Sequence, residues 1–187
     1  TGITKTFVPF YSSFPEILCN FVRINFNPIF MSDPKTLFLL DAYALIYRSY
    51  YAFINNPRIT TTGINTSATF GFCNFLIELL ELEKPTHIAV IFDPEGPTFR
   101  HEMYTPYKAQ RPPMPEDLRK SIPYIKKIIA GLGISCLDAP GYEADDFIGT
   151  LAKRAEKEGY TVYMITPDKD YARFPHDLPL QILWYFL

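Results

Sequence analysis

The sequence has few of the features that would place it in several large protein classes. Its 187 residues include three cysteines, Cys19, Cys73 and Cys136, without a CxxC pair. This excludes a disulfide framework and a cysteine zinc site, and it fits a reducing compartment. No apolar run approaches the roughly 18 residues of a membrane span, so we expect no membrane partner. The net charge of -2 provides no general attraction for nucleic acid.

The two ends of the chain lack the patterning of its middle. Residues 1–30 are rich in Phe, Asn and Pro and show no periodicity, and their Pro and Asn interruptions argue against a signal peptide. We expect a poorly ordered leader from upstream translated sequence at 1–30. Residues 172–187 hold two prolines and finish apolar, and we interpret them as a divergent tail. One domain remains, at residues 31–171.

Strand and helix signals alternate through that domain. Short apolar runs predict strands, and longer amphipathic patterns predict helices. The predicted strands are 36–40, 87–92, 134–137 and 160–166, and the predicted helices are 42–53, 67–82, 116–130 and 142–158. Alternating strands and helices predict an α/β fold with a mostly parallel, doubly wound sheet that helices cover on both faces.

Acidic residues follow the predicted strands. GYEADD, which begins at Gly141, places three carboxylates within four residues, and carboxylates this close raise one another's pKa unless a positive charge joins them. The carboxyl ends of the strands face one crevice in such sheets, so acids distant in sequence are expected to converge there. The seven acids are Asp41, Asp93, Glu143, Asp145, Asp146, Asp168 and Asp170.

The residue types indicate the cation. A helix N-terminus offsets only about 0.3–1 kcal/mol per negative group, too little for a cluster of this size. Oxygen ligands without His or Cys favour Mg²⁺ or Mn²⁺ over Zn²⁺. Two carboxylate-held ions about 4 Å apart are a common arrangement for phosphodiester cleavage, so a nucleic-acid backbone is the expected substrate. Taken singly, each acid also fits a turn or a helix cap.

Positive charge gathers between Arg100 and Lys127, where seven Lys or Arg stand against three acids. Tyr104 and Tyr107 can stack on unpaired bases, while Lys108 and Arg111 can contact phosphates, as expected of a single-strand binding surface. Four prolines between 106 and 115 predict a segment held away from the sheet. The alternative is a solvated loop followed by an ordinary amphipathic helix.

Four blocks of this sequence resemble one known family. They are FLLDAYALIYRSYYA, IFDPEGPTFRHEMYTPYKAQRPPMPEDL, PGYEADDFIGTLAKRAEKEGY and TPDKDY. Over residues 36–171 they are similar to the 5′-3′ exonuclease (flap endonuclease) domain at the N-terminus of bacterial DNA polymerase I, a PIN-like fold. A PIN-like ribonuclease would not account for the long FRHEMYTPYKAQRPPMP block.

The resemblance implies a metal-dependent nuclease that removes 5′ flaps and RNA primers in replication and repair. DNA with a 5′ flap, a nick or a primer would be its partner, and we expect a monomer in the cytoplasm, at the nucleoid. The seven acids match the family's metal ligands. Its phosphate-binding residues match Arg48, Tyr107, Lys108 and Arg111, with Arg100 a further candidate, and we expect Lys108 and Arg111 to stabilise phosphate charge in catalysis.

The sequence departs from the family pattern after Tyr171. The family continues with a further Asp pair, which completes its second metal site, and with a Gly-rich helix-hairpin-helix element, whereas no glycine follows Gly159 here. We therefore interpret the chain as an N-terminal fragment with an incomplete sheet and impaired activity. A non-catalytic DNA-binding remnant and an inert truncated product are the alternatives.

Overall fold

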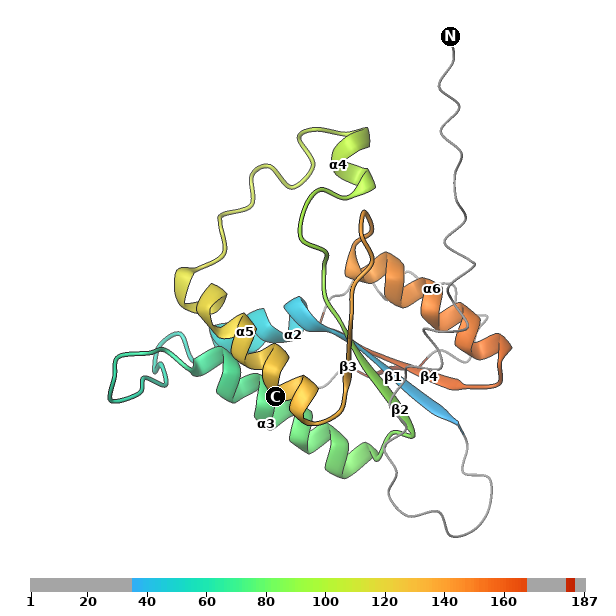
Figure 1. The fold of residues 1–187 in the computed structure, drawn as a ribbon, viewed down its shortest axis with the longest axis horizontal. Helices are drawn as coiled ribbons and strands as arrows, with labels where there is room; N and C mark the ends of the chain where they lie inside the picture. Colours follow the sequence, from blue (N-terminus) through green and yellow to red (C-terminus); the bar gives the residue numbers. More distant parts are fainter. Residues whose placement is uncertain (1–34, 168–180, 184–187) are drawn as a thin grey trace.

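Short apolar strands form one sheet at the centre of the molecule, which is described here from a computed structural model covering residues 35–167 and 181–183 (Figure 1). The strands are β1 (Thr36–Asp41), β2 (His87–Ile91), β3 (Ser135–Leu137), β4 (Thr161–Ile165) and β5 (Gln181–Leu183). Their order is β3-β2-β1-β4-β5, and every neighbouring pair is parallel. The predicted parallel sheet is confirmed. The expected leader and most of the expected tail, with Asp168 and Asp170, lie outside the described residues.

The register of the central strands brings the predicted acids to one edge. Asp41 at the end of β1 pairs with Ile91 at the end of β2, two residues before Asp93. On the other side of β1, Leu40 pairs with Ile165 of β4. The chain moves outward from β1 through β2 to β3 and then returns to β4 on the opposite side. The change of direction between β1 and β4 is where α/β sheets of this kind bind ligands.

Within the described residues, five helices connect the strands, and they cover both faces of the sheet. They are α2 (Ala42–Ala52), α3 (Ser67–Glu83), α4 (Phe99–Met103), α5 (Glu116–Gly131) and α6 (Ala144–Lys157). Phe38 and Leu40 of β1 pack with buried residues of α2, α3 and α5. Leu37 and Leu39, which point to the opposite face, pack with buried residues of α6. Strands buried on both faces are continuous apolar runs, as β1 is, and the predicted double covering is confirmed.

Two short elements were not predicted. The helix α4 has five residues, and its start is fixed by Thr98 and His101, whose side chains form a capping box. The strand β5 has three residues and pairs with β4 from Tyr163↔Gln181 to Ile165↔Leu183. Elements this short contain too few residues to leave a periodic pattern in the sequence.

None of the described helices has the length and apolar character needed to cross a membrane.

Candidate active site

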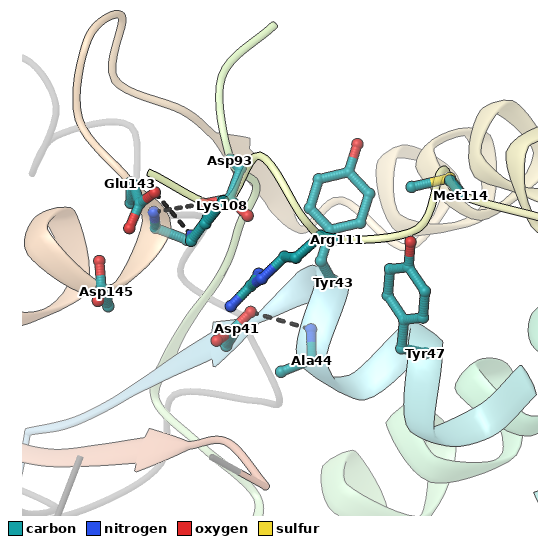
Figure 2. A pocket seen from close by; sticks show the side chains of 11 residues that line it. Asp41, Tyr43, Ala44, Tyr47, Asp93, Lys108, Arg111, Met114, Glu143 and Asp145 are labelled. Carbon is teal, nitrogen blue, oxygen red and sulfur yellow. Dashed lines mark hydrogen bonds and ion pairs between the residues drawn. The ribbon is translucent and has the colours of Figure 1, made fainter. Parts of the chain in front are cut away.

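A pocket of about 380 Å³ opens at the carboxyl ends of β1 and β2 (Figure 2). Four of the predicted acids and two of the predicted basic residues line it together: Asp41, Asp93, Glu143, Asp145, Lys108 and Arg111. They come from two strand ends, the start of α6 and the segment between α4 and α5. The convergence expected from the positions of the strands is therefore present among the described residues.

The first two acids also cap helices. An Oδ1 atom of Asp41 accepts a hydrogen bond of 3.1 Å from the backbone nitrogen of Ala44, at the start of α2. The Oδ1 atom of Asp93 accepts one of 2.7 Å from the nitrogen of Ala144, at the start of α6. The hydroxyl of Thr166, after β4, lies 3.4 Å from Oδ2 of Asp41. These bonds fix both carboxylates at the pocket; they join the end of β1 to the residue after β4, and Asp93 after β2 to the start of α6.

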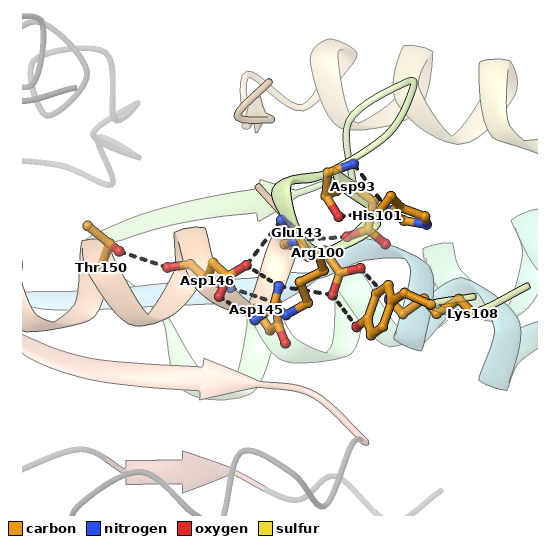
Figure 3. A network of polar contacts seen from close by, with 11 residues as sticks. Asp93, Arg100, His101, Lys108, Glu143, Asp145, Asp146 and Thr150 are labelled. Carbon is orange, nitrogen blue, oxygen red and sulfur yellow. Dashed lines mark hydrogen bonds and ion pairs between the residues drawn. The ribbon is translucent and has the colours of Figure 1, made fainter. Parts of the chain in front are cut away.

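Glu143 is the centre of a network of charged groups (Figure 3). Its side chain is 7% exposed. Oε1 lies 2.6 Å from Nζ of Lys108, while Oε2 accepts hydrogen bonds from the hydroxyl of Tyr107 at 3.0 Å and from Arg100 at 3.2 Å. A buried carboxylate is tolerated when paired charges and hydrogen bonds satisfy it, and these three partners do so.

Arg100 joins Glu143 to the next acid. Its guanidinium makes a bidentate pair with Asp146: Nη2 lies 2.7 Å from Oδ1, and Nη1 contacts Oδ2. The hydrogen bond to Asp146 raises the pKa of Arg100, so the guanidinium stays charged. In this structure the positive charge that GYEADD requires is supplied by Arg100 and Lys108.

Burial and charge change the pKa of Asp145, which lies between Glu143 and Asp146 in the sequence. Burial raises the pKa of Asp145, and the neighbouring Asp146 raises it further. A carboxylate held in this way would be stabilised by an added positive charge within a few ångströms. The sequence pattern alone indicated mutual repulsion, and the structure adds partial burial as the larger cause.

Two tyrosines of α2 also line the pocket, and the sequence analysis did not single them out. Tyr43 and Tyr47 lie one helical turn apart on the same face, and Tyr43 packs edge-on against Phe92 with ring centroids 5.6 Å apart. Burial raises the pKa of both hydroxyls, so they are neutral at physiological pH. The sequence signal that could have identified them is the i, i+4 spacing of two aromatic residues shortly after Asp41, which places both on one face of the helix.

Other predicted residues lie apart from the pocket lining. Arg48 is on α2 and is not a lining residue. Tyr104, predicted to stack on bases, is 63% exposed at the end of α4. Arg100 reaches the pocket through its ion pair with the lining residue Glu143, and Asp146 in turn pairs with Arg100. Asp168 and Asp170 are outside the described residues.

The residue types at the pocket fit a hard cation. Its charged oxygen donors are carboxylates, and no His or Cys is among its lining residues. Over residues 35–167, however, no three His, Cys, Asp or Glu side chains approach one another closely enough to hold a metal ion. Lys108 and Arg100 contact two of the expected ligands, so Glu143 and Asp146 are paired with protein cations here.

Comparison with known proteins supports the same family. The family model of the 5′-3′ exonuclease N-terminal resolvase-like domain matches residues 36–181. DNA polymerase I of Treponema pallidum is 48% identical over 140 residues, which are 75% of this chain and 14% of that protein. A 5′-3′ exonuclease of Aquifex aeolicus is 42% identical over 136 residues, which are 73% of this chain and 46% of that protein. The chain thus spans less than half the length of these relatives.

Solved structures share the fold. The bacteriophage T5 5′-exonuclease with divalent zinc ions bound has a TM-score of 0.52 at 18% identity, over 73% of this chain and 51% of that chain. A T5 flap endonuclease variant, in a pseudo-enzyme-product complex with DNA and metal ions, has a TM-score of 0.54 at 18% identity. The match covers 78% of this chain and 53% of the T5 chain. By the family match and the identity to these relatives, the chain belongs to the family of 5′-3′ exonuclease N-terminal, resolvase-like domains.

Proposed function

We propose that this chain hydrolyses phosphodiester bonds of DNA at or near 5′ ends, as a metal-dependent 5′-3′ exonuclease and flap endonuclease. The observation that carries the proposal is the pocket in which four carboxylates and two basic side chains meet. The names of the relatives and the DNA and metal ions of the T5 structure support it. The proposed substrates are 5′ flaps and primer-containing duplexes.

The proposed cation ligands are the acids at the strand ends. Asp41, Asp93, Glu143 and Asp145 line the pocket, and Asp146 lies beside it. We expect Asp168 and Asp170, which follow β4 in the sequence, to complete the set of ligands. We expect two bound ions, either Mg²⁺ or Mn²⁺. Bound divalent ions would supply an activated water and neutralise charge on the phosphate.

The chain's own basic groups would hold the substrate phosphate. Lys108 and Arg111 line the pocket beside the carboxylates, and Figure 2 shows the guanidinium of Arg111 pointing toward Asp41. Fixed cations near the phosphate stabilise the charge that develops during hydrolysis. Arg100, Tyr107 and the exposed Tyr104 would contact the DNA strand on the same side, and Arg48 would contact it from α2.

Cleavage of a 5′-labelled flap duplex tests the proposal. We expect release of the flap in Mg²⁺ or Mn²⁺, none in EDTA, and at least about a hundredfold slower release by Asp93→Asn, because removing one ligand charge weakens the ions and the charge balance. Asp138→Asn is the matched control, since Asp138 is an exposed acid outside the pocket. Metal-independent cleavage would refute the proposal. Flap binding without cleavage by the folded chain would select the non-catalytic alternative.

A further inference from the structure

Residues 104–113, here called the connecting segment, join α4 to α5 and are mostly exposed. Tyr107 and Lys108 are half-buried, whereas residues 104–106 and 109–113 are exposed. The segment's backbone hydrogen bonds are local turns, such as Tyr107 N to Tyr104 O at 2.9 Å and Arg111 N to Lys108 O at 3.0 Å. The segment's half-buried side chains are therefore those of Tyr107 and Lys108, and the Tyr107 ring packs edge-on against His101 of α4 with centroids 5.3 Å apart.

Both of those side chains end on one carboxylate. Lys108 Nζ lies 2.6 Å from Oε1 of Glu143, and the Tyr107 hydroxyl lies 3.0 Å from Oε2. The backbone of Lys108 has φ of +56°, in the left-handed region that residues other than glycine rarely adopt. The pair with Glu143 thus holds a backbone conformation that is otherwise unfavourable.

The start of α4 is attached to the body of the protein by other contacts. The backbone nitrogen of Phe99 donates a hydrogen bond of 2.8 Å to the carbonyl of Gly141. The Phe99 ring also lies 5.7 Å from the ring of Tyr142. These contacts do not involve the Glu143 side chain. Loss of the Glu143 contacts would therefore loosen the connecting segment from Lys108 onward, while α4 and the Tyr107 ring packed on its His101 stay in place.

We propose that Glu143 is a shared group that couples cation binding to opening of the connecting segment. In the cation-free protein Glu143 tethers the segment through Tyr107 and Lys108. A divalent cation that binds Glu143 competes with the Lys108 ammonium for the same carboxylate and repels it. The release turns Lys108 and Tyr107 toward a phosphate-bearing strand, so cation and DNA binding favour each other. The coupling rests on the proposed function, which supplies the cation site.

Rapid-mixing hydrogen exchange of the full chain measures the tether without catalysis. Ca²⁺ is the probe, because it binds carboxylate oxygens. We expect the protection factors of the amides from Tyr107 to Arg111 to fall about tenfold when Ca²⁺ saturates the protein. This corresponds to an opening equilibrium constant about tenfold larger. The amides of Leu76 and Leu79 in the buried part of α3 serve as the internal control.

Two variants separate the tether from the general charge of the pocket. Lys108→Met and Arg111→Met each remove one positive charge from the pocket lining, but only Lys108 pairs with Glu143. We expect Lys108→Met to exchange rapidly without Ca²⁺ and to bind Ca²⁺ about tenfold more tightly by calorimetry, a difference of about 1.4 kcal/mol. Arg111→Met should keep the response to Ca²⁺ and bind it within about twofold of the original affinity, because exposed charges are screened.

The outcomes distinguish the coupling from the proposed function. Calcium binding without a change in exchange of the connecting segment would overturn the tether and leave the cation site intact. Equal tightening of Ca²⁺ binding in both variants would also overturn the tether, since the charge of the pocket would explain it. No calcium binding by the folded, unsubstituted chain would overturn the proposed function and the coupling with it.

Discussion

Replacing Arg100 with glutamine removes the cation that joins Glu143 to Asp146. Arg100 makes two bonds to Asp146 and one to Glu143, and its side chain is 28% exposed. A hydrogen bond to a charged group contributes about 1.5–3 kcal/mol when buried, and an exposed ion pair about 0.2–1 kcal/mol. Arg100 is half-buried, so its three bonds together should contribute more than an exposed ion pair and less than three fully buried bonds. We expect the variant to lose about 2 kcal/mol of unfolding free energy at pH 7.

Urea denaturation followed by circular dichroism measures this loss. With a slope of about 2 kcal/mol/M, Arg100→Gln should lower the urea midpoint by about 1 M at pH 7. The control is Arg119→Gln, because Arg119 is 65% exposed and lies 3.9 Å from Glu116. The charge of Arg100 lowers the pKa of Asp145, so its removal lets Asp145 bind a proton more readily. The deficit of the variant should therefore shrink as the pH falls toward 4, near the ordinary pKa of Asp.

The reasoning would be refuted if Arg100→Gln and Arg119→Gln shifted the midpoint equally. It would also be refuted if the deficit of Arg100→Gln did not change between pH 7 and pH 4. The first result would mean that the network around Glu143 contributes no more than a solvent-exposed pair, and the second that the charge of Arg100 does not affect the protonation of Asp145.

Three further changes follow from other contacts. Asp145→Asn should raise the cation-free unfolding free energy at pH 7, because burial and Asp146 disfavour the charged form. The gain should disappear as the pH falls through the raised pKa of Asp145, and the same variant should lose metal-dependent flap cleavage. Asp93→Ala should cost about 1 kcal/mol in denaturation through the lost cap of α6, while Asp93→Asn, which can still accept the bond from Ala144, should cost less than half as much. Leu39→Ala should cost about 2–5 kcal/mol, since Leu39 is fully buried between the sheet and α6, and a cost under about 1 kcal/mol would contradict the described packing.

The sheet and its acidic edge could be predicted from the sequence because their signals are strong. The central strands β1, β2 and β4 are short, mostly apolar runs, and parallel strands must present their carboxyl ends on one side. That rule alone brings Asp41, Asp93 and Glu143 together, and the pocket contains all three. The alternative that single acids serve as helix caps was also partly right, because Asp41 and Asp93 do cap helices.

The partners of the acids could not be predicted, because they depend on where a proline-rich segment folds back. Lys108 and Tyr107 are 35 and 36 residues from Glu143 in sequence, and nothing in a composition of Pro, Tyr and Lys fixes that contact. The sequence analysis assigned Arg100, Tyr107 and Lys108 to a DNA surface, and in the structure all three bond to carboxylates. That assignment stays a prediction for the DNA-bound protein.

Anomalous X-ray scattering from crystals of the chain grown with Mn²⁺ tests the central claim most directly. The account predicts a manganese peak in the pocket beside Asp41, Asp93, Glu143 and Asp145, and its loss in crystals of Asp93→Asn. It also predicts that Lys108 no longer contacts Glu143 where that peak is present. A map without manganese in the pocket, from crystals in which Mn²⁺ binds elsewhere on the chain, would contradict the assignment of these carboxylates as the metal site.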